Sequence, residues 1–215
     1  MPLQYLTEPV VVRRLNYWMK VLTNLADDEL LRLMASNNEQ AFTVLYQRRQ
    51  SAVYRFALQM SGSPSVAEET TQEVFLILLR EASGYDPARG PLASYLYGVA
   101  RRLVWRRMAQ DRTHVQIGEE EEDGRMPEQL IARSEVESDL VRDQAVRSLR
   151  RAILALPVAY REAVVLCDLH ELSYAEAARA LGCAVGTVRS RLHRARALLS
   201  ERLASKRSSS SGCLV

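Results

Sequence analysis

The chain has 215 residues, of which 47% are hydrophobic and 26% are charged, and its formal net charge is +3. Nine glycines and seven prolines are few, so the composition favours an all-α protein of one or two domains with a hydrophobic core in each. Three cysteines without C-x-x-C spacing argue against a disulfide framework and a zinc site. The longest apolar runs fall short of about 18 residues, which argues against membrane insertion. We therefore expect a soluble cytoplasmic protein without metal or cofactor.

The chain begins with an extension, residues 1–24, to which the sequence assigns no role. After it, apolar residues follow helical spacing, and Asp27 and Asp28 can cap the first predicted helix and complement its dipole. The Asn-Asn pair at 37–38 ends this helix. A second predicted helix follows and ends at Ser-Gly-Ser-Pro, residues 61–64.

The third predicted helix covers Val66 to Ala82, with one apolar side facing inward. The inward residues are Ala67, Thr71, Val74 and Leu78. The opposite side carries an acidic and amide stripe, the residues Glu69, Gln72, Glu73, Leu76 and Arg80. A stripe of this kind centred on one leucine suits a partner protein better than DNA, although its spacing alone favours an ordinary solvated face.

A Pro/Gly loop at 83–91 precedes the fourth predicted helix, Leu92 to about Ala109. Leu96, Ala100 and Leu103 share its core side, and the other side carries Arg101, Arg102, Trp105 and Arg106. Arginines interleaved with an exposed aromatic ring suit single-stranded nucleic acid, because cations follow the phosphates and rings stack on bases. The alternative is that Trp105 packs against its own domain and the arginines are solvated.

The C-terminal half is separated from these helices by a predicted flexible acidic linker, residues 113–134. Five adjacent carboxylates at 119–123 repel one another and resist burial. A second helical domain is expected over 135–204, with a core helix from Tyr160 to Leu169. Residues 205–215 are expected to form a disordered tail.

Residues 172–196 are predicted to form a helix-turn-helix. Ser173 and Glu176 have the spacing of a capping box, and Gly182 permits a turn with positive φ. In the second helix the buried face consists of Val188, Leu192, Ala195 and Leu199. The outward face consists of Gly186, Arg189, Ser190, His193 and Arg196, with Arg194 on its flank. These side chains suit phosphates and guanine edges; the alternative is a solvated basic face.

Three segments, taken in order, resemble the extracytoplasmic-function (group IV) sigma factors of the sigma-70 family, which recruit bacterial RNA polymerase to promoters. AEETTQEVF at 67–75 is similar to region 2.2, LASYLYGVARRLVWRR at 92–107 to regions 2.3 and 2.4, and LSYAEAARALGCAVGTVRSRLHRAR at 172–196 to region 4. The order of these motifs strengthens the resemblance beyond what any one of them carries.

The chain departs from the family's usual residues at five positions. Glu69 replaces an aspartate and keeps its charge, whereas Tyr95 replaces a frequent tryptophan. Arg102 and Arg106 stand where asparagine and aspartate are usual, which puts the base preference at the minus-10 element in doubt. Ala184 replaces a serine or proline and provides a weaker start for the recognition helix.

The resemblance implies a division of labour between the two domains. Residues 25–112 would be region 2, which binds core RNA polymerase and recognises and melts the minus-10 element. Residues 135–204 would be region 4, which reads the minus-35 element. The implied partners are promoter DNA, the β′ clamp helices and β flap of the polymerase, and an anti-sigma factor that covers the Glu69/Gln72/Glu73 stripe.

The implied contact residues fall into three sets. The polymerase-binding set is Glu69, Gln72, Glu73, Leu76 and Arg80. The minus-10 set is Tyr85, Arg89, Tyr97, Arg101, Arg102, Trp105 and Arg106. The minus-35 set is Gly186, Thr187, Arg189, Ser190, Arg191, His193, Arg194 and Arg196.

Two other functions fit the sequence less well. A stand-alone helix-turn-helix repressor or activator would need a dimer to span two half-sites, and the sequence has no dimerising heptads. A helical enzyme using His114, His170 or His193 lacks metal-ligand spacing, a nucleophile motif or a phosphate loop, so we expect no catalysis. We interpret Cys167 as a buried core residue and His170 as a structural surface residue.

Overall fold

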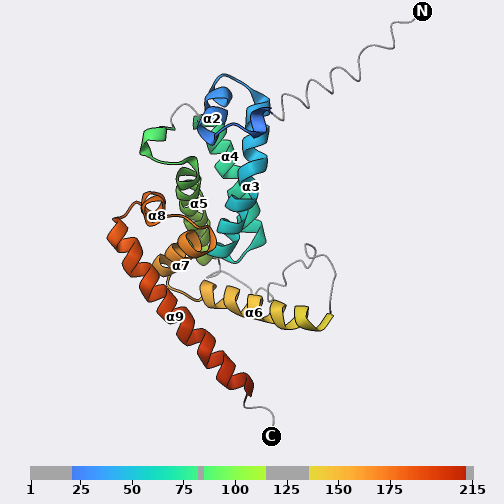
Figure 1. The fold of residues 1–215 in the computed structure, drawn as a ribbon, viewed down its shortest axis with the longest axis vertical. Helices are drawn as coiled ribbons and strands as arrows, with labels where there is room; N and C mark the ends of the chain where they lie inside the picture. The colour runs from blue at the N-terminus through green and yellow to red at the C-terminus, as the bar shows by residue number, and fades with distance from the viewer. Residues whose placement is uncertain (1–20, 82–84, 115–135, 212–215) are drawn as a thin grey trace, which may run out of the picture.

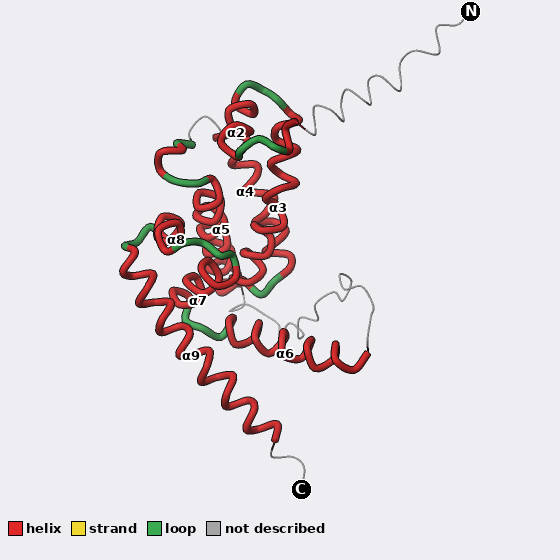
Figure 2. Tube along the Cα trace, viewed as in Figure 1, coloured by secondary structure: helices red, strands yellow, loops and turns green. Residues whose placement is uncertain are grey.

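This computed structural model describes residues 21–81, 85–114 and 136–211 (Figure 1). The described part is built from helices and contains no β-strand (Figure 2), which confirms the predicted all-α class. No helix within it is both long and apolar enough to span a membrane. Most of the predicted N-terminal extension and almost all of the acidic linker lie outside the described residues.

The first domain is a helical bundle whose ends follow local sequence signals. Its elements are α2 (Asp27–Ala35), α3 (Glu39–Ser61), α4 (Pro64–Glu81), the 3-10 turn η2 (Pro87–Arg89) and α5 (Leu92–His114). The Asn38 side chain accepts a hydrogen bond from the Ala41 amide over 3.0 Å and caps the start of α3. Gly62, with φ +77°, ends α3 in the left-handed region. Both predicted helix breaks are therefore confirmed.

Asp27 holds α2 against α3 through two arginines. Ala26 occupies the N-cap position of α2, and Asp27 lies in its first turn, where a negative charge complements the helix dipole. One Asp27 oxygen accepts from Arg48 at 2.7 Å, and the other accepts from Nε of Arg49 at 2.7 Å. The aspartate that the sequence marked as a helix-start signal therefore also fixes the packing of α2.

In the second domain, the short helix α7 packs against the long C-terminal helix α9. Its elements are α6 (Val136–Leu154), α7 (Val158–Val164), the π-helical segment η4 (Val165–Leu169), α8 (Tyr174–Leu181) and α9 (Val185–Ser211). The tail predicted from residue 205 is wrong in its first part, because α9 continues to Ser211. A nucleated helix extends by one hydrogen bond per added residue, so a sequence without a stop signal continues it.

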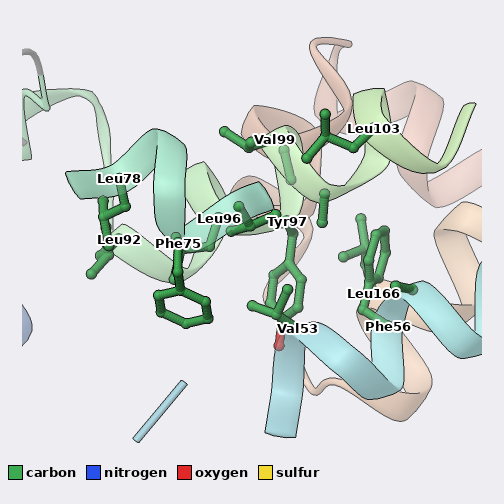
Figure 3. Packing of buried hydrophobic residues seen from close by; sticks show 14 of the residues in the cluster. Val53, Phe56, Phe75, Leu78, Leu92, Leu96, Tyr97, Val99, Leu103 and Leu166 are labelled. Carbon is green, nitrogen blue, oxygen red and sulfur yellow. The ribbon is translucent and has the colours of Figure 1, made fainter. Parts of the chain in front are cut away.

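The two domains share one hydrophobic core, which the sequence did not predict. Leu166 of the second domain is fully buried and belongs to the same cluster as Phe56, Tyr97 and Leu103 of the first (Figure 3). Helix α5 lies between α3 and α8 and packs against both (Figure 1). The second domain therefore docks on α5 and on one end of α3.

Two glycines of the first domain permit this close docking. A Cβ at Gly98 of α5 would lie 3.4 Å from the backbone oxygen of Ala180 in α8. A Cβ at Gly62 would lie 3.1 Å from a side-chain carbon of Leu154 in α6, and its φ of +77° also disfavours other residues. Larger side chains at either position would push the second domain away.

Replacement of Leu166 tests the shared core. Leu166→Ala is expected to lower the free energy of unfolding by about 2–5 kcal/mol, because it leaves a cavity between the domains. Leu169→Ala is the matched control; this side chain is 38% exposed, and its loss should cost less than about 1 kcal/mol. Urea unfolding followed by circular dichroism measures both values. Equal costs for the two variants would contradict the shared core.

Candidate nucleic-acid and partner interfaces

The helix-turn-helix has the local structure that its sequence predicts. The Ser173 hydroxyl accepts a hydrogen bond from the Glu176 amide at 3.3 Å, and the Glu176 carboxylate accepts from the Ser173 amide at 2.8 Å. These hydrogen bonds lower the pKa of Glu176, against a smaller opposing effect of burial. Gly182 ends α8 with φ +64°. The predicted capping box and glycine turn are both confirmed.

Helix α9 presents a basic face to solvent because its apolar face is anchored in the core. Val188, Leu192 and Ala195 are at most 1% exposed, as predicted, and Leu199 is half-buried. The exposed residues of the predicted minus-35 set are Gly186, Arg189, Ser190, His193, Arg194 and Arg196, whereas Thr187 and Arg191 are half-buried. The Arg189 guanidinium lies 6.0 Å from the centre of the Tyr174 ring. A cation–π contact of this kind holds Arg189 on the outward side.

Arg196 stands apart from the other exposed arginines of α9. Its guanidinium forms two hydrogen bonds with the Asp168 carboxylate, at 2.6 and 3.1 Å. This carboxylate raises the pKa of Arg196. Arg196 therefore connects α9 to η4 and lies on the flank of the outward face of α9.

The predicted polymerase-binding stripe lies along the exposed side of α4. Glu69, Gln72 and Arg80 are exposed, and Leu76 is 49% exposed. Leu79, which the sequence interpretation left out, is 47% exposed and widens the apolar part of this side. Two large exposed leucines beside an exposed amide favour a protein partner over plain solvation.

Two arginines of α5 bind the acidic members of this stripe. Arg107 donates to Glu69 at 3.0 Å and to Glu73 at 2.8 Å, and Arg106 donates to Glu73 at 2.6 Å. Partial burial alone would raise the pKa of Glu73, but the hydrogen bonds and charges of both arginines outweigh it and lower the pKa. The sequence interpretation missed Arg107. Arg107 lies four residues after the core residue Leu103, and this spacing places it on the side of α5 that faces the other helices.

The loop before α5 forms a small pocket that contains part of the minus-10 set. Tyr85, Arg89, Ser94 and Tyr95 line it, together with Arg179 of α8. The Tyr85 hydroxyl donates to the Gly90 carbonyl at 2.7 Å, and burial, aided by the Asp28 charge, raises its pKa to about 12. Within the described part of the chain, the buried Ser94 hydroxyl has no hydrogen-bond partner.

The other members of the minus-10 set differ in exposure. Arg102 is exposed, and Trp105 is 40% exposed. Tyr97 is only 6% exposed, and its hydroxyl lies 2.9 Å from Nδ1 of His170. Trp105 and Arg101 both donate to the buried carboxylate of Glu162 in α7. The structure therefore covers Tyr97 and engages Arg101 and Trp105 with the second domain.

His170 and the cysteines occupy different environments from those expected. His170 is half-buried rather than on the surface, because its ring packs between Phe56 and Tyr97. Cys167 and Cys183 are half-buried free thiols, and burial raises the pKa of Cys167. Among the residues that the structure describes, no group of three or more His, Cys, Asp and Glu side chains is placed to hold a metal ion.

Two family descriptions match this chain. The description "Sigma-70 region 2" matches residues 45–113, and "Sigma-70, region 4" matches residues 147–199. The ECF RNA polymerase sigma factor SigE of Mycolicibacterium smegmatis is 34% identical over 167 residues, which are 74% of this chain and 60% of that protein. The ECF RNA polymerase sigma factor SigK of Mycobacterium bovis BCG is 30% identical over 172 residues, 77% of this chain and 87% of that protein.

A solved structure has a similar fold. The sigma factor RpoE of Bartonella quintana, in complex with the anti-sigma factor NepR, aligns with a TM-score of 0.58 and 25% sequence identity. The alignment covers 72% of this chain and 91% of that chain. The similarity therefore extends over most of the described helices.

The capping box gives a pH-dependent contribution to stability. The folded-state pKa of Glu176 lies below its ordinary value of 4.5, so its contribution is present above pH 4.5 and is lost as the pH falls through the folded-state pKa. Glu176→Gln should lower the free energy of unfolding by about 1 kcal/mol at neutral pH and lose this pH dependence. Urea titrations at several pH values, with the exposed Glu201→Gln as control, measure the effect. A constant difference between wild type and Glu176→Gln across the acid range would contradict it.

Proposed function

We propose that this chain binds core RNA polymerase and directs it to promoters by reading a minus-35 element and melting a minus-10 element. The proposal starts from the family: this chain belongs to the extracytoplasmic-function sigma factors of the sigma-70 family. The observation that carries this proposal is the presence, in one chain, of an outward basic face on α9 and, on α4, an exposed acidic and amide stripe with two exposed leucines. One surface suits DNA and the other suits a protein. An initiation factor needs both.

Reading of the minus-35 element is assigned to the exposed face of α9. Arg189, Ser190, His193 and Arg194 are exposed near the start of this helix, where a helix-turn-helix meets base edges in the major groove. An arginine fork can bond two acceptors of one guanine, which discriminates against other bases by about 1–3 kcal/mol. Arg196, bonded to Asp168, instead fixes the angle of α9 and contributes a flanking phosphate contact.

Melting of the minus-10 element is assigned to the loop before α5 and to the basic side of α5. The pocket lined by Tyr85, Ser94 and Tyr95 offers aromatic surface and an unpartnered hydroxyl, the features that hold an extruded base. Arg102 and Trp105 continue this surface and supply a cation for the phosphates and a ring for stacking. Stacking of about 1–3 kcal/mol per base is comparable with the cost of opening one base step.

Binding to core polymerase is assigned to α4, where Gln72, Leu76 and Leu79 are exposed side by side on one helix. The polymerase elements implied by family resemblance are the β′ clamp helices for this stripe and the β flap for the second domain. Glu69 and Glu73 contribute negative charge, and Arg106 and Arg107 hold their side chains in place.

Control by an anti-sigma factor is also proposed, since the similar RpoE of Bartonella quintana was solved in complex with the anti-sigma factor NepR. We assign the Glu69/Gln72/Glu73 stripe to that interface, because a partner on this face would block polymerase binding directly. A structure of such a complex that leaves the stripe exposed to solvent would contradict this assignment.

Leu76→Ala is expected to weaken binding to core RNA polymerase about tenfold, because loss of a central apolar contact costs roughly 1–2 kcal/mol. Val21→Ala is the control, since this side chain is 37% exposed but precedes α2 and lies outside both α4 and the second domain. Fluorescence anisotropy of labelled protein titrated with core polymerase measures both affinities. Equal affinity of Leu76→Ala and wild type would remove α4 from the interface.

Arg189→Ala is expected to abolish sequence-selective initiation while leaving binding to core polymerase intact, because the arginine lies on the DNA side of α9. Run-off transcription from a promoter library, with and without the protein, measures this loss. Arg32→Ala removes an equal charge from the exposed side of α2 and should behave as wild type. Duplex binding by the protein alone, without polymerase-dependent initiation, would instead support a stand-alone repressor.

A further inference from the structure

We propose that Tyr174 is a positioning residue for base recognition, because its ring holds the Arg189 guanidinium by one face and leaves the N–H donors of that arginine free. The inference rests on the proposed function, which assigns Arg189 to the minus-35 element. Tyr174 lies outside the recognition helix and outside the predicted minus-35 set. It acts on sequence selectivity through Arg189 and not by bonding to a base.

The place of Tyr174 is fixed by the chain on both sides of it. Tyr174 is the first residue of α8 and follows the N-cap residue Ser173, whose carbonyl accepts a hydrogen bond from the Ala177 amide at 2.9 Å. Before the cap, the Leu172 amide donates to the Leu166 carbonyl at 3.0 Å and ties the chain to η4. The ring of Tyr174 therefore projects from a well-anchored backbone, and the residue is 36% exposed.

The contact with Arg189 restrains this arginine without using its donors. The guanidinium carbon lies 6.0 Å from the centre of the Tyr174 ring, within the range of a cation–π contact. A planar guanidinium stacks on a ring by its face, whereas its N–H groups point outward in its own plane. Within the described part of the chain, no hydrogen bond or ion pair involves the Arg189 side chain. Arg189 is thus held and still able to donate to a base.

Arg196 provides an internal comparison on the same helix. It lies seven residues further along α9, about two helical turns, and is also exposed. A carboxylate holds this arginine, because Nε and one terminal nitrogen donate to Asp168 at 3.1 and 2.6 Å. Two of its N–H donors are therefore used within the protein. Of the two arginines, only Arg189 combines restraint with the free fork that bonds two acceptors of one guanine.

The surroundings of Arg189 leave room for a base pair. Gly186 precedes it by three residues, so the two residues lie on the same side of α9. Among the described residues, a Cβ placed on Gly186 would meet no atom within 4 Å. A duplex can therefore approach Arg189 from the Gly186 side without displacing Tyr174.

Restraint by Tyr174 should raise sequence selectivity rather than general affinity for DNA. Phosphate contacts set overall affinity and its salt dependence, whereas base contacts set sequence preference. An exposed cation–π contact corresponds to about a two- to fivefold effect on an equilibrium. Because a restrained Arg189 has lost rotamer freedom before DNA binds, this gain should appear at the base pair that Arg189 reads.

The test compares Tyr174→Leu with Tyr174→Phe in the full chain. Leucine removes the aromatic face, whereas phenylalanine keeps the face and removes only the hydroxyl. Arg189→Ala identifies the base pair that Arg189 reads, and the other positions of the DNA site serve as the internal reference. The double variant Tyr174→Leu/Arg189→Ala shows whether the ring acts through the arginine.

Two measurements are made on each variant. Side-chain NMR of the free protein with isotopically labelled arginine gives the order parameter of the Arg189 Nε–H group. Selection of duplexes with a randomised minus-35 element, by the protein alone and with core polymerase, gives the base preference at every position. Tyr174→Leu should lower the order parameter and reduce preference at the Arg189 base pair about two- to fivefold. Tyr174→Phe should match wild type in both, and the double variant should match Arg189→Ala.

The proposal is overturned if Tyr174→Leu keeps the wild-type preference at the Arg189 base pair or lowers preference equally at every position, as general loss of the helix-turn-helix would. It is also overturned if Tyr174→Phe loses as much as Tyr174→Leu, since the hydroxyl would then act. An order parameter unchanged by Tyr174→Leu overturns it whether or not DNA is bound.

Initiation of transcription by wild type with core polymerase is scored separately. A base-specific loss in duplex binding by the protein alone, without any initiation, would support the role of Tyr174 and count against the proposed sigma function alone.

Discussion

The ion pair between Glu162 and Arg101 joins the two domains at a carboxylate that is almost fully buried. An almost fully buried carboxylate is stable only when it is paired, and within the described part of the chain its partners belong to the other domain. This requirement fixes α7 against α5. The apolar contact of Leu166 and the close approach at Gly98 then follow, because both lie in the same interface. The conformation described is therefore one unit with two exposed faces, one on α4 and one on α9.

The predicted contact surfaces differ in whether they are exposed to solvent or bonded to the other domain. The stripe on α4 and the outward side of α9 are open to solvent, so binding to polymerase or duplex DNA needs no rearrangement at those residues. Of the predicted minus-10 residues, Tyr97 is buried and Arg101 and Trp105 donate to Glu162 of the second domain, whereas Arg89, Arg102 and Arg106 are exposed.

The sequence predicted features that depend on neighbours along the chain. The capping box at Ser173, the turn at Gly182 and the break at Asn38 are local, and helical periodicity identified the exposed sides of α4 and α9. It did not predict contacts between distant segments. The partners of Glu162 and Arg107 lie in other helices, and no local spacing encodes such pairs. For the same reason the shared core was missed.

The most direct test of this account is the distance between spin labels at Ser51→Cys and Ser200→Cys, recorded before and after addition of core polymerase and promoter DNA. We expect one short distance in the free protein and a longer one in the initiation complex, because Arg101 and Trp105 are bonded to Glu162 of the second domain in the free protein. An unchanged short distance in a complex that initiates transcription would contradict it.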